Sequence, residues 1–159
     1  MSARLNKQEF EAYAALVASS TLLQRAIEKN LQEQQSDLTQ VQFEILMHLY
    51  NVPDGYRMAD LADRLIVSRS GLTYQAGLME KAGLIARERH GSDERGVVAR
   101  ITDKGEAVRQ KVLPGHLAVV RGSFLGLLSS AELDTVTELL GRVTAALGQE
   151  AVRESASLD

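Results

Sequence analysis

Apolar residues recur at spacings of three and four along most of the chain, which is the pattern of amphipathic helices. The first such stretch covers residues 6–35 and predicts one long helix. A single, mostly apolar stripe along it is formed by Tyr13, Leu16, Ser20, Leu23, Ile27 and Leu31. At about 1.5 Å per residue this helix would be about 45 Å long, which is longer than a small compact domain needs. We therefore expect part of it to meet another subunit.

Three shorter helices are expected next. Thr39, with Gln42 three positions on, forms a capping box that starts the first of them. A short helix at residues 58–66 and another at residues 69–82 follow, and Ser68 is placed to cap the latter. The residues of this last helix that should face the core are Leu72, Leu78 and Met79.

The pattern then changes to two short strand-like runs at residues 84–89 and 97–101. A polar, glycine-rich segment separates them, which predicts a β-hairpin. Beyond the hairpin, Thr102 is placed to cap another helix, which is expected to reach Leu128 with a bend near Pro114.

A second capping box, Ser129 with Glu132, opens a last helix with the same spacing of apolar residues. Residues after Glu150 are expected to fray. Helix, helix, short turn, helix and charged hairpin, in that order, are the elements of a winged helix-turn-helix. The expected fold is therefore mainly α with a small β-hairpin wing (α+β), flanked on both sides by long amphipathic helices.

The composition is that of a globular protein without thiols. Of the 159 residues, 45% are hydrophobic and 25% are charged. No cysteine is present, which excludes disulfides, thiolate metal sites and cysteine nucleophiles. The first ten residues lack the apolar segment of a signal peptide, and no apolar run approaches the roughly 18 residues that span a bilayer. We expect a cytoplasmic protein with no membrane partner.

The charge is unevenly distributed along the chain. Residues 56–111 hold 11 of the 18 basic residues but only 8 of the 21 acidic ones. A mildly basic middle between acidic flanks suits a nucleic-acid-binding face, although so small an excess also arises by chance.

The helix at residues 69–82 carries the first candidate DNA contacts. The second helix of a helix-turn-helix enters the major groove with its N-terminal turns nearest the bases. Arginine can pair with guanine and glutamine with adenine, and a helix N-terminus favours a phosphate. The candidates are Ser68, Arg69, Ser70, Thr73, Tyr74 and Gln75. A capped helix with a solvated polar face would show the same residues.

The hairpin carries the second set. Arg95 lies at its tip, two positions after Asp93. A basic side chain at the end of a two-stranded arm can enter a minor groove, and a neighbouring carboxylate can orient the guanidinium. Arg87, Arg89 and Arg100 on the strands are candidates for phosphate contacts. An ordinary exposed loop of balanced charge is the alternative.

Several short motifs in residues 38–105 occur together at defined spacings. They are Leu38-Thr39 with Phe43 and Leu46, Leu61-Ala62, Ser70 with Thr73, Gly83-Leu84-Ile85, Asp93-Glu94-Arg95 and Ile101-Thr102-Asp103-Lys104-Gly105. This stretch resembles the MarR family of bacterial transcriptional regulators. The resemblance implies a homodimer, Arg95 in the minor groove, and repression that a small molecule relieves. Tyr74, where many members carry a basic residue, and Gly77 depart from the pattern and leave the operator sequence open.

The flanking helices fit the family's dimerisation region. We expect residues 1–36 and 103–159 to form it and residues 37–102 to form the DNA-binding domain. Two apolar stripes buried between copies would place the recognition helices about one DNA turn apart, on a pseudo-palindromic operator. The expected dimer residues are Leu16, Leu133, Val136, Leu140, Val143 and Leu147. The alternative is that both helices fold back on their own subunit.

The resemblance also implies an effector pocket where the long helices meet the winged domain. Its expected residues are Tyr13, Met47, His48, Tyr50 and His116. Mixed apolar and polar walls suit a phenolic or lipophilic ligand, or an aromatic anion, but each residue could equally be a filled core position. His48, His90 and His116 are dispersed, so we expect no metal and no cofactor.

Catalysis is not expected. The sequence has no phosphate loop, no G-x-S-x-G and no H-E-x-x-H motif. The other candidate function is a winged helix used only for protein contacts, without specific DNA binding. Binding to duplex DNA that weakens steeply with salt would separate the two, because phosphate neutralisation releases counterions.

Overall fold

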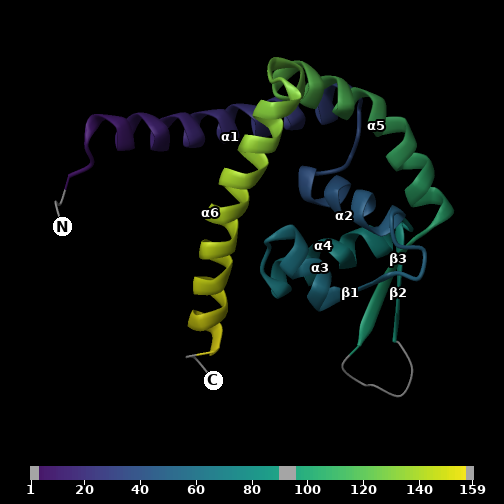
Figure 1. Cartoon of the computed structure of the whole chain (residues 1–159). Helices are drawn as coiled ribbons and strands as arrows, with labels where there is room; N and C mark the ends of the chain where they lie inside the picture. Colours follow the sequence, from purple (N-terminus) through teal and green to yellow (C-terminus); the bar gives the residue numbers. More distant parts are fainter. Residues whose placement is uncertain (1–3, 90–95, 157–159) are drawn as a thin grey trace. The chain divides into compact units, whose positions relative to one another are not determined.

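The computed structural model describes residues 4–89 and 96–156 and is mostly helical, with one small antiparallel sheet. Residues 1–119 and 120–159 form two compact units. The elements, labelled in Figure 1, are α1 (Lys7–Glu33), α2 (Gln40–Tyr50), β1 (Tyr56–Arg57), α3 (Met58–Leu65), α4 (Arg69–Lys81), β2 (Ile85–Arg89), β3 (Val97–Ile101), α5 (Asp103–Ser123), the 3-10 helix η1 (Leu125–Leu127) and α6 (Ser130–Ala156).

Side-chain caps explain where the helices begin. The Thr39 hydroxyl accepts from the Gln42 amide at 3.2 Å, and the Gln42 side chain accepts from the Thr39 amide at 3.1 Å. This confirms the first predicted capping box. The box at the start of α6 is also confirmed, because the Ser129 amide donates to Glu132 Oε2 at 2.8 Å. A third box, formed by Asn6 with Glu9 at the start of α1, was not predicted.

The helix-turn-helix is formed by α3 and α4. Ile66, which follows α3, has a left-handed backbone with φ 55°. Ser68 then caps α4, since its hydroxyl accepts from the Gly71 amide at 3.1 Å. Gly83, at φ 74°, follows the C-terminal end of α4 and turns the chain into β2. The predicted helix boundaries here are confirmed to within one residue.

The wing is a three-stranded antiparallel sheet in the order β1-β3-β2. The strands β2 and β3 pair in register from Ile85 opposite Ile101 to Arg89 opposite Val97. Figure 1 shows this pair extending away from the helices of the same unit. The two-residue strand β1 was not predicted. It follows Gly55, whose φ of 85° and close approach to the Ala99 carbonyl leave no room for a side chain.

One core joins the winged domain to α5. Its largest fully buried side chains are Phe43, Ile45, Leu46, Leu49, Leu61, Leu72, Met79, Ile85 and Val112. Leu78, which was expected to face the core, is instead 39% exposed. The buried stripe of α4 runs through Leu72, Ala76 and Met79, and Leu78 lies about 100° around the helix from it.

The C-terminal ends of α5 and α6 differ from the prediction. Helix α5 contains Pro114 and ends at Ser123, and a single 3-10 turn follows where the helix was expected to reach Leu128. Helix α6 continues to Ala156, so the prediction of fraying after Glu150 was wrong. Among the described residues no single helix is long and apolar enough to cross a membrane, although α5 with η1 and α6 pass the same test when taken as a bent pair.

Candidate nucleic-acid interface

The N-terminal turns of α4 present a polar, solvent-exposed face. Arg69, Ser70, Thr73 and Tyr74 are all exposed there, and the Tyr74 side chain is 66% exposed. The apolar residues Leu72, Ala76 and Met79 point the other way, into the core. This alternation follows from the helical repeat of 3.6 residues, which separates an inner apolar stripe from an outer polar one.

Some of the hydrogen-bond donors and acceptors on this face already have partners within the protein. The Thr73 hydroxyl donates to the Arg69 carbonyl at 2.8 Å, which leaves its oxygen able to accept. Within the described residues the Arg69 guanidinium has no ion-pair or hydrogen-bond partner. The Ser68 and Ser70 hydroxyls lie 3.3 Å apart beside the first turn. This end of α4 therefore offers one cation, two hydroxyls and the helix N-terminal amides to an anionic ligand.

Gln75 lies differently from its neighbours. It is only half-exposed, and its Oε1 accepts from Nε2 of Gln42 at 2.9 Å. Gln42 is itself buried and also closes the cap of α2 with Thr39. The side chain expected to read adenine is thus bound to α2 in this structure, and it ties the two helices together.

Arg87 was expected to contact phosphate, but its side chain turns back to α4. Its Nη2 and Nε donate to Oε2 of Glu80 at 2.6 and 3.0 Å, and its backbone amide donates to Oε1 at 3.2 Å. The hydrogen bond from the Arg87 side chain is the main reason that the pKa of Glu80 is lowered. The pair holds β2 of the wing against α4.

The rest of the wing set is only partly described. Arg89 ends β2, opposite Val97. Asp93 and Arg95 lie outside the described residues. On β3, the Arg100 Nε donates to the Asp54 carbonyl at 3.1 Å, which attaches the wing to the loop before β1.

Two of the expected effector residues, Met47 and Tyr50, contact a buried arginine that was not predicted from the sequence. Arg109 of α5 is 5% exposed, and its guanidinium carbon lies 3.6 Å from the centroid of the Tyr50 ring. Its Nη1 lies 3.8 Å from the Met47 sulfur, and its Nε and Nη2 donate to Glu106 at 2.7 and 2.8 Å. The hydrogen bond to Glu106 raises the pKa of Arg109. The spacing of Glu106 and Arg109 was the available signal, because helical residues three apart face each other.

The remaining expected effector residues are not brought to this cluster. Tyr13 is exposed on α1, and His48 is half-buried in the last turn of α2. The His116 ring packs on Phe43 with centroids 4.8 Å apart, and its buried Nδ1 has no hydrogen-bond partner among the described residues. Burial lowers the pKa of His116, which the charge of Glu44 partly opposes.

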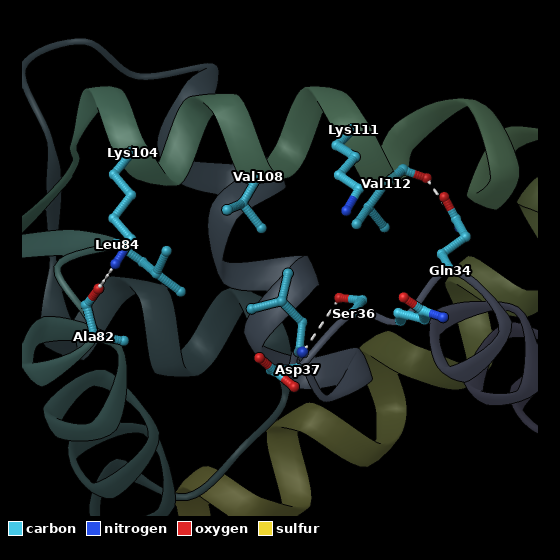
Figure 2. A pocket seen from close by; sticks show the side chains of 11 residues that line it. Gln34, Ser36, Asp37, Ala82, Leu84, Lys104, Val108, Lys111 and Val112 are labelled. Atoms are coloured by element: carbon cyan, nitrogen blue, oxygen red, sulfur yellow. Dashed lines mark hydrogen bonds between the residues drawn. The ribbon is translucent and has the colours of Figure 1, made fainter.

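A pocket of about 290 Å³ lies beside α5 in the same unit, and none of the five expected effector residues lines it. Figure 2 shows the pocket between three segments, which are the α1–α2 connection, the turn that follows α4, and helix α5. Within the described residues no cluster of His, Asp and Glu could hold a metal ion.

The expected dimer residues lie on incompletely covered faces of their helices. Leu16 of α1 is exposed, and so are Leu140, Val143 and Leu147 of α6, whereas Leu133 and Val136 are half-exposed. Phe10, Tyr13, Val17 and Leu22 extend the exposed apolar surface of α1. Apolar surface of this extent is typical of helices that bind a partner.

Comparison with known proteins finds related sequences and similar folds. The MarR family model matches residues 36–96. AbsC, a MarR family transcriptional regulator from Streptomyces coelicolor, is 35% identical, with a TM-score of 0.85 over 92% of this chain and 98% of that one. Sco3205, a MarR family regulator from the same organism solved in complex with DNA, is 27% identical, with a TM-score of 0.86 over 92% of each chain. The HTH-type transcriptional regulator MhqR of Bacillus subtilis is 28% identical over 106 residues, which are 67% of this chain and 72% of MhqR.

Proposed function

This chain belongs to the MarR family of winged helix-turn-helix transcriptional regulators, and we propose that it acts as a homodimeric repressor of a pseudo-palindromic operator. The observation that carries the proposal is the exposed N-terminal face of α4, where the Arg69 guanidinium has no partner among the described residues and Ser70, Thr73 and Tyr74 are exposed beside it. Members of this family are transcriptional regulators and not enzymes.

Helix α4 enters the major groove in this proposal. The first-turn amides of α4 other than that of Gly71, which donates to Ser68, lie against a phosphate, because the positive end of a helix dipole favours an anion. Arg69 reads a base edge, and a bidentate contact with guanine is the pairing that its planar fork makes best. Ser70, Thr73 and Tyr74 complete the contact surface.

Gln75 and Arg87 have supporting roles. Gln75 holds α4 against α2 through Gln42, and it reads a base only by sharing or giving up that hydrogen bond. Arg87 sets the position of the wing through Glu80 and does not bind phosphate itself. The wing then carries Arg89 and Arg95 to the DNA, with Asp93 orienting Arg95 in the minor groove.

Two copies associate through residues 1–36 and 103–159. Burying the exposed apolar faces of α1 and α6 between subunits removes them from water, which is the main driving force for such an interface. The contacts are made by Leu16, Leu133, Val136, Leu140, Val143 and Leu147. The two-fold axis of the dimer then matches the two half-sites of the operator.

An effector releases the repressor from DNA in the cytoplasm. The site proposed for it is the region of Met47 and Tyr50 around Arg109. Tyr13, His48 and His116, which lie outside that cluster, are proposed as further contacts. An aromatic ring and a thioether suit a phenolic or lipophilic molecule.

The test is selection of bound fragments from genomic DNA, followed by titration of the selected duplex at several salt concentrations. We expect affinity to fall steeply as salt rises. Arg69→Ala should cost about 1–3 kcal/mol at one base pair and relax the preference there. Arg95→Ala should weaken binding to all sequences. Arg25→Ala, an exposed arginine of α1, is the matched control. Absence of DNA binding at low salt would favour a module for protein contacts instead.

A further inference from the structure

Gln42 of α2 is a buried glutamine whose side-chain amide has a partner at both ends. The residue is 8% exposed. Its Oε1 accepts from the backbone amide of Thr39 at 3.1 Å, and its Nε2 donates to Oε1 of Gln75 in α4 at 2.9 Å. Its own backbone amide donates to the Thr39 hydroxyl at 3.2 Å. Hydrogen bonds on both sides therefore fix the position and the rotation of this side chain.

The direction of these hydrogen bonds follows from the chemistry of Thr39. A backbone N–H can only donate, so the Gln42 atom that faces it must be the carbonyl oxygen. The Gln42 amide nitrogen then faces α4, and the Gln75 atom opposite this donor must be Oε1. Turning either side-chain amide by half a rotation would place two donors against each other. The polarity of the backbone at Thr39 is thus passed through two side chains to the recognition helix.

One end of the Gln75 amide stays available for a ligand. Gln75 is half-exposed, and its Nε2 has no hydrogen-bond partner among the described residues. This nitrogen carries two N–H donors and no acceptor. Gln75 can therefore share its amide between Gln42 and a base in one way, with Oε1 kept on Gln42 and Nε2 directed to the base. What it offers to DNA is a hydrogen-bond donor.

We propose that Gln42 is a positioning residue that makes Gln75 select guanine at one position of each operator half-site. In the major groove guanine presents two acceptors, N7 and O6, whereas adenine places an amino group beside N7 and cytosine presents only an amino group. A fixed donor pairs best with the first and worst with the last. The adenine contact expected from residue type alone needs both ends of the amide. This assignment rests on the proposed DNA-binding function.

The substitution Gln42→Glu reverses the last hydrogen bond without removing the contact. A glutamate three residues after a threonine cap is a usual partner in a capping box, so the start of α2 is preserved. The introduced carboxylate only accepts, so Gln75 must turn its amide and donate Nε2 to α2. Its Oε1 then faces the base and accepts from N6 of adenine or N4 of cytosine. The same side chain would therefore read the opposite pattern.

The experiment selects binding sites from a randomised duplex library with the full chain and its variants. Gln75→Ala identifies the position concerned, because the preference there should be lost. At that position the wild type should prefer guanine over cytosine about threefold to tenfold, the worth of one hydrogen bond. Gln42→Glu should prefer adenine or cytosine there and match the wild type elsewhere. Gln42→Met, which keeps the length but not the hydrogen bonds, should weaken the guanine preference.

The matched control is Gln40→Glu, which adds the same charge two positions away on α2. The Gln40 side chain contacts Glu44 and not α4, so this variant should keep the base preference of the wild type. A second measurement needs no DNA. In NMR spectra of the free chain, the side-chain NH₂ of Gln75 should exchange rapidly with water in the wild type and slowly in Gln42→Glu.

Several results would overturn the proposal. They are an unchanged preference in Gln75→Ala, a guanine preference retained in Gln42→Glu or in Gln42→Met, and a shift of preference in the Gln40→Glu control. A uniform loss of affinity in Gln42→Glu, with no change of base preference, would show a merely structural role. A wild type that binds no duplex at low salt would overturn the repressor function and the base contact together, whereas the NMR exchange rates would still test the orientation that Gln42 imposes.

Discussion

Replacing Arg109 by alanine tests the connection between α2 and α5. The side chain is almost fully buried and makes three kinds of contact at once. It forms two hydrogen bonds with the Glu106 carboxylate, a cation–π contact with the Tyr50 ring and a weak contact with the Met47 sulfur. Arg109→Ala removes all of them and leaves the Glu106 carboxylate without its cation.

The expected loss follows from the burial of the two partners. Removing one partner of a fully buried ion pair costs about 3–5 kcal/mol, because an uncompensated charge remains. Glu106 is 23% exposed and keeps a hydrogen bond from Gln110 at 2.7 Å, so its charge stays partly solvated. Loss of the cation–π contact adds about 1 kcal/mol. We expect the free energy of unfolding to fall by about 2–3 kcal/mol at neutral pH.

The pH dependence gives a second, independent check. The hydrogen bond from Arg109 is the main cause of the lowered pKa of Glu106. A carboxyl group whose pKa is lowered by folding stabilises the protein above its ordinary pKa of 4.5. That stabilisation is lost as the pH falls through the lowered value. The difference between wild type and Arg109→Ala should therefore narrow as the solution becomes acidic.

The assay is urea unfolding followed by circular dichroism at several pH values. Lys111→Ala, an exposed cation on the same helix, serves as the control and should change stability by less than about 0.5 kcal/mol. The reasoning is refuted if Arg109→Ala is no more destabilising than this control, or if its deficit is the same in acid as at neutral pH.

Four further substitutions test local features. A Cβ on Gly105 would collide with the Leu84 carbonyl, so Gly105→Ala should lower the free energy of unfolding in urea by about 2–3 kcal/mol. Gly122→Ala, with no described atom within 4 Å of the added Cβ, should raise the free energy of unfolding by about 0.5–1 kcal/mol. Equal changes in stability for Gly105→Ala and Gly122→Ala would contradict this account. Ile66 is 77% exposed with a left-handed backbone, so Ile66→Gly should stabilise by about 0.5–1 kcal/mol, and a lower melting temperature would disprove the strain. Burial lowers the pKa of His116, so the wild type should lose stability as the pH falls below 6.5, while His116→Phe should show a smaller loss in thermal melts over the same range.

Features encoded within a few neighbouring residues were predictable from the sequence. The capping boxes at Thr39 and Ser129 and the cap at Ser68 need only side chains three positions away. The exposed face at Arg69 and Thr73 follows from the helical repeat. These local rules were enough to predict the order of the α-helices and of the β2–β3 hairpin, and the position of α4.

Features that depend on partners distant in the sequence were missed. The short strand β1 exists because Tyr56 pairs with Ala99 of β3. Gln75 carries no local sign that Gln42 would bind it. Arg109 is likewise buried because its guanidinium packs on the ring of Tyr50, which belongs to another helix. In each case the residue type was compatible with exposure, and only the packing of two elements decided otherwise.

The most direct test of the central claim is the stoichiometry of the complex with the selected operator duplex, measured by analytical ultracentrifugation with rising salt. We expect two chains on one duplex, dissociation of the complex as salt rises, and a weaker complex with Arg69→Ala. A single chain on each duplex, or binding that neither salt nor Arg69→Ala weakens, would contradict a dimer that reads DNA through α4.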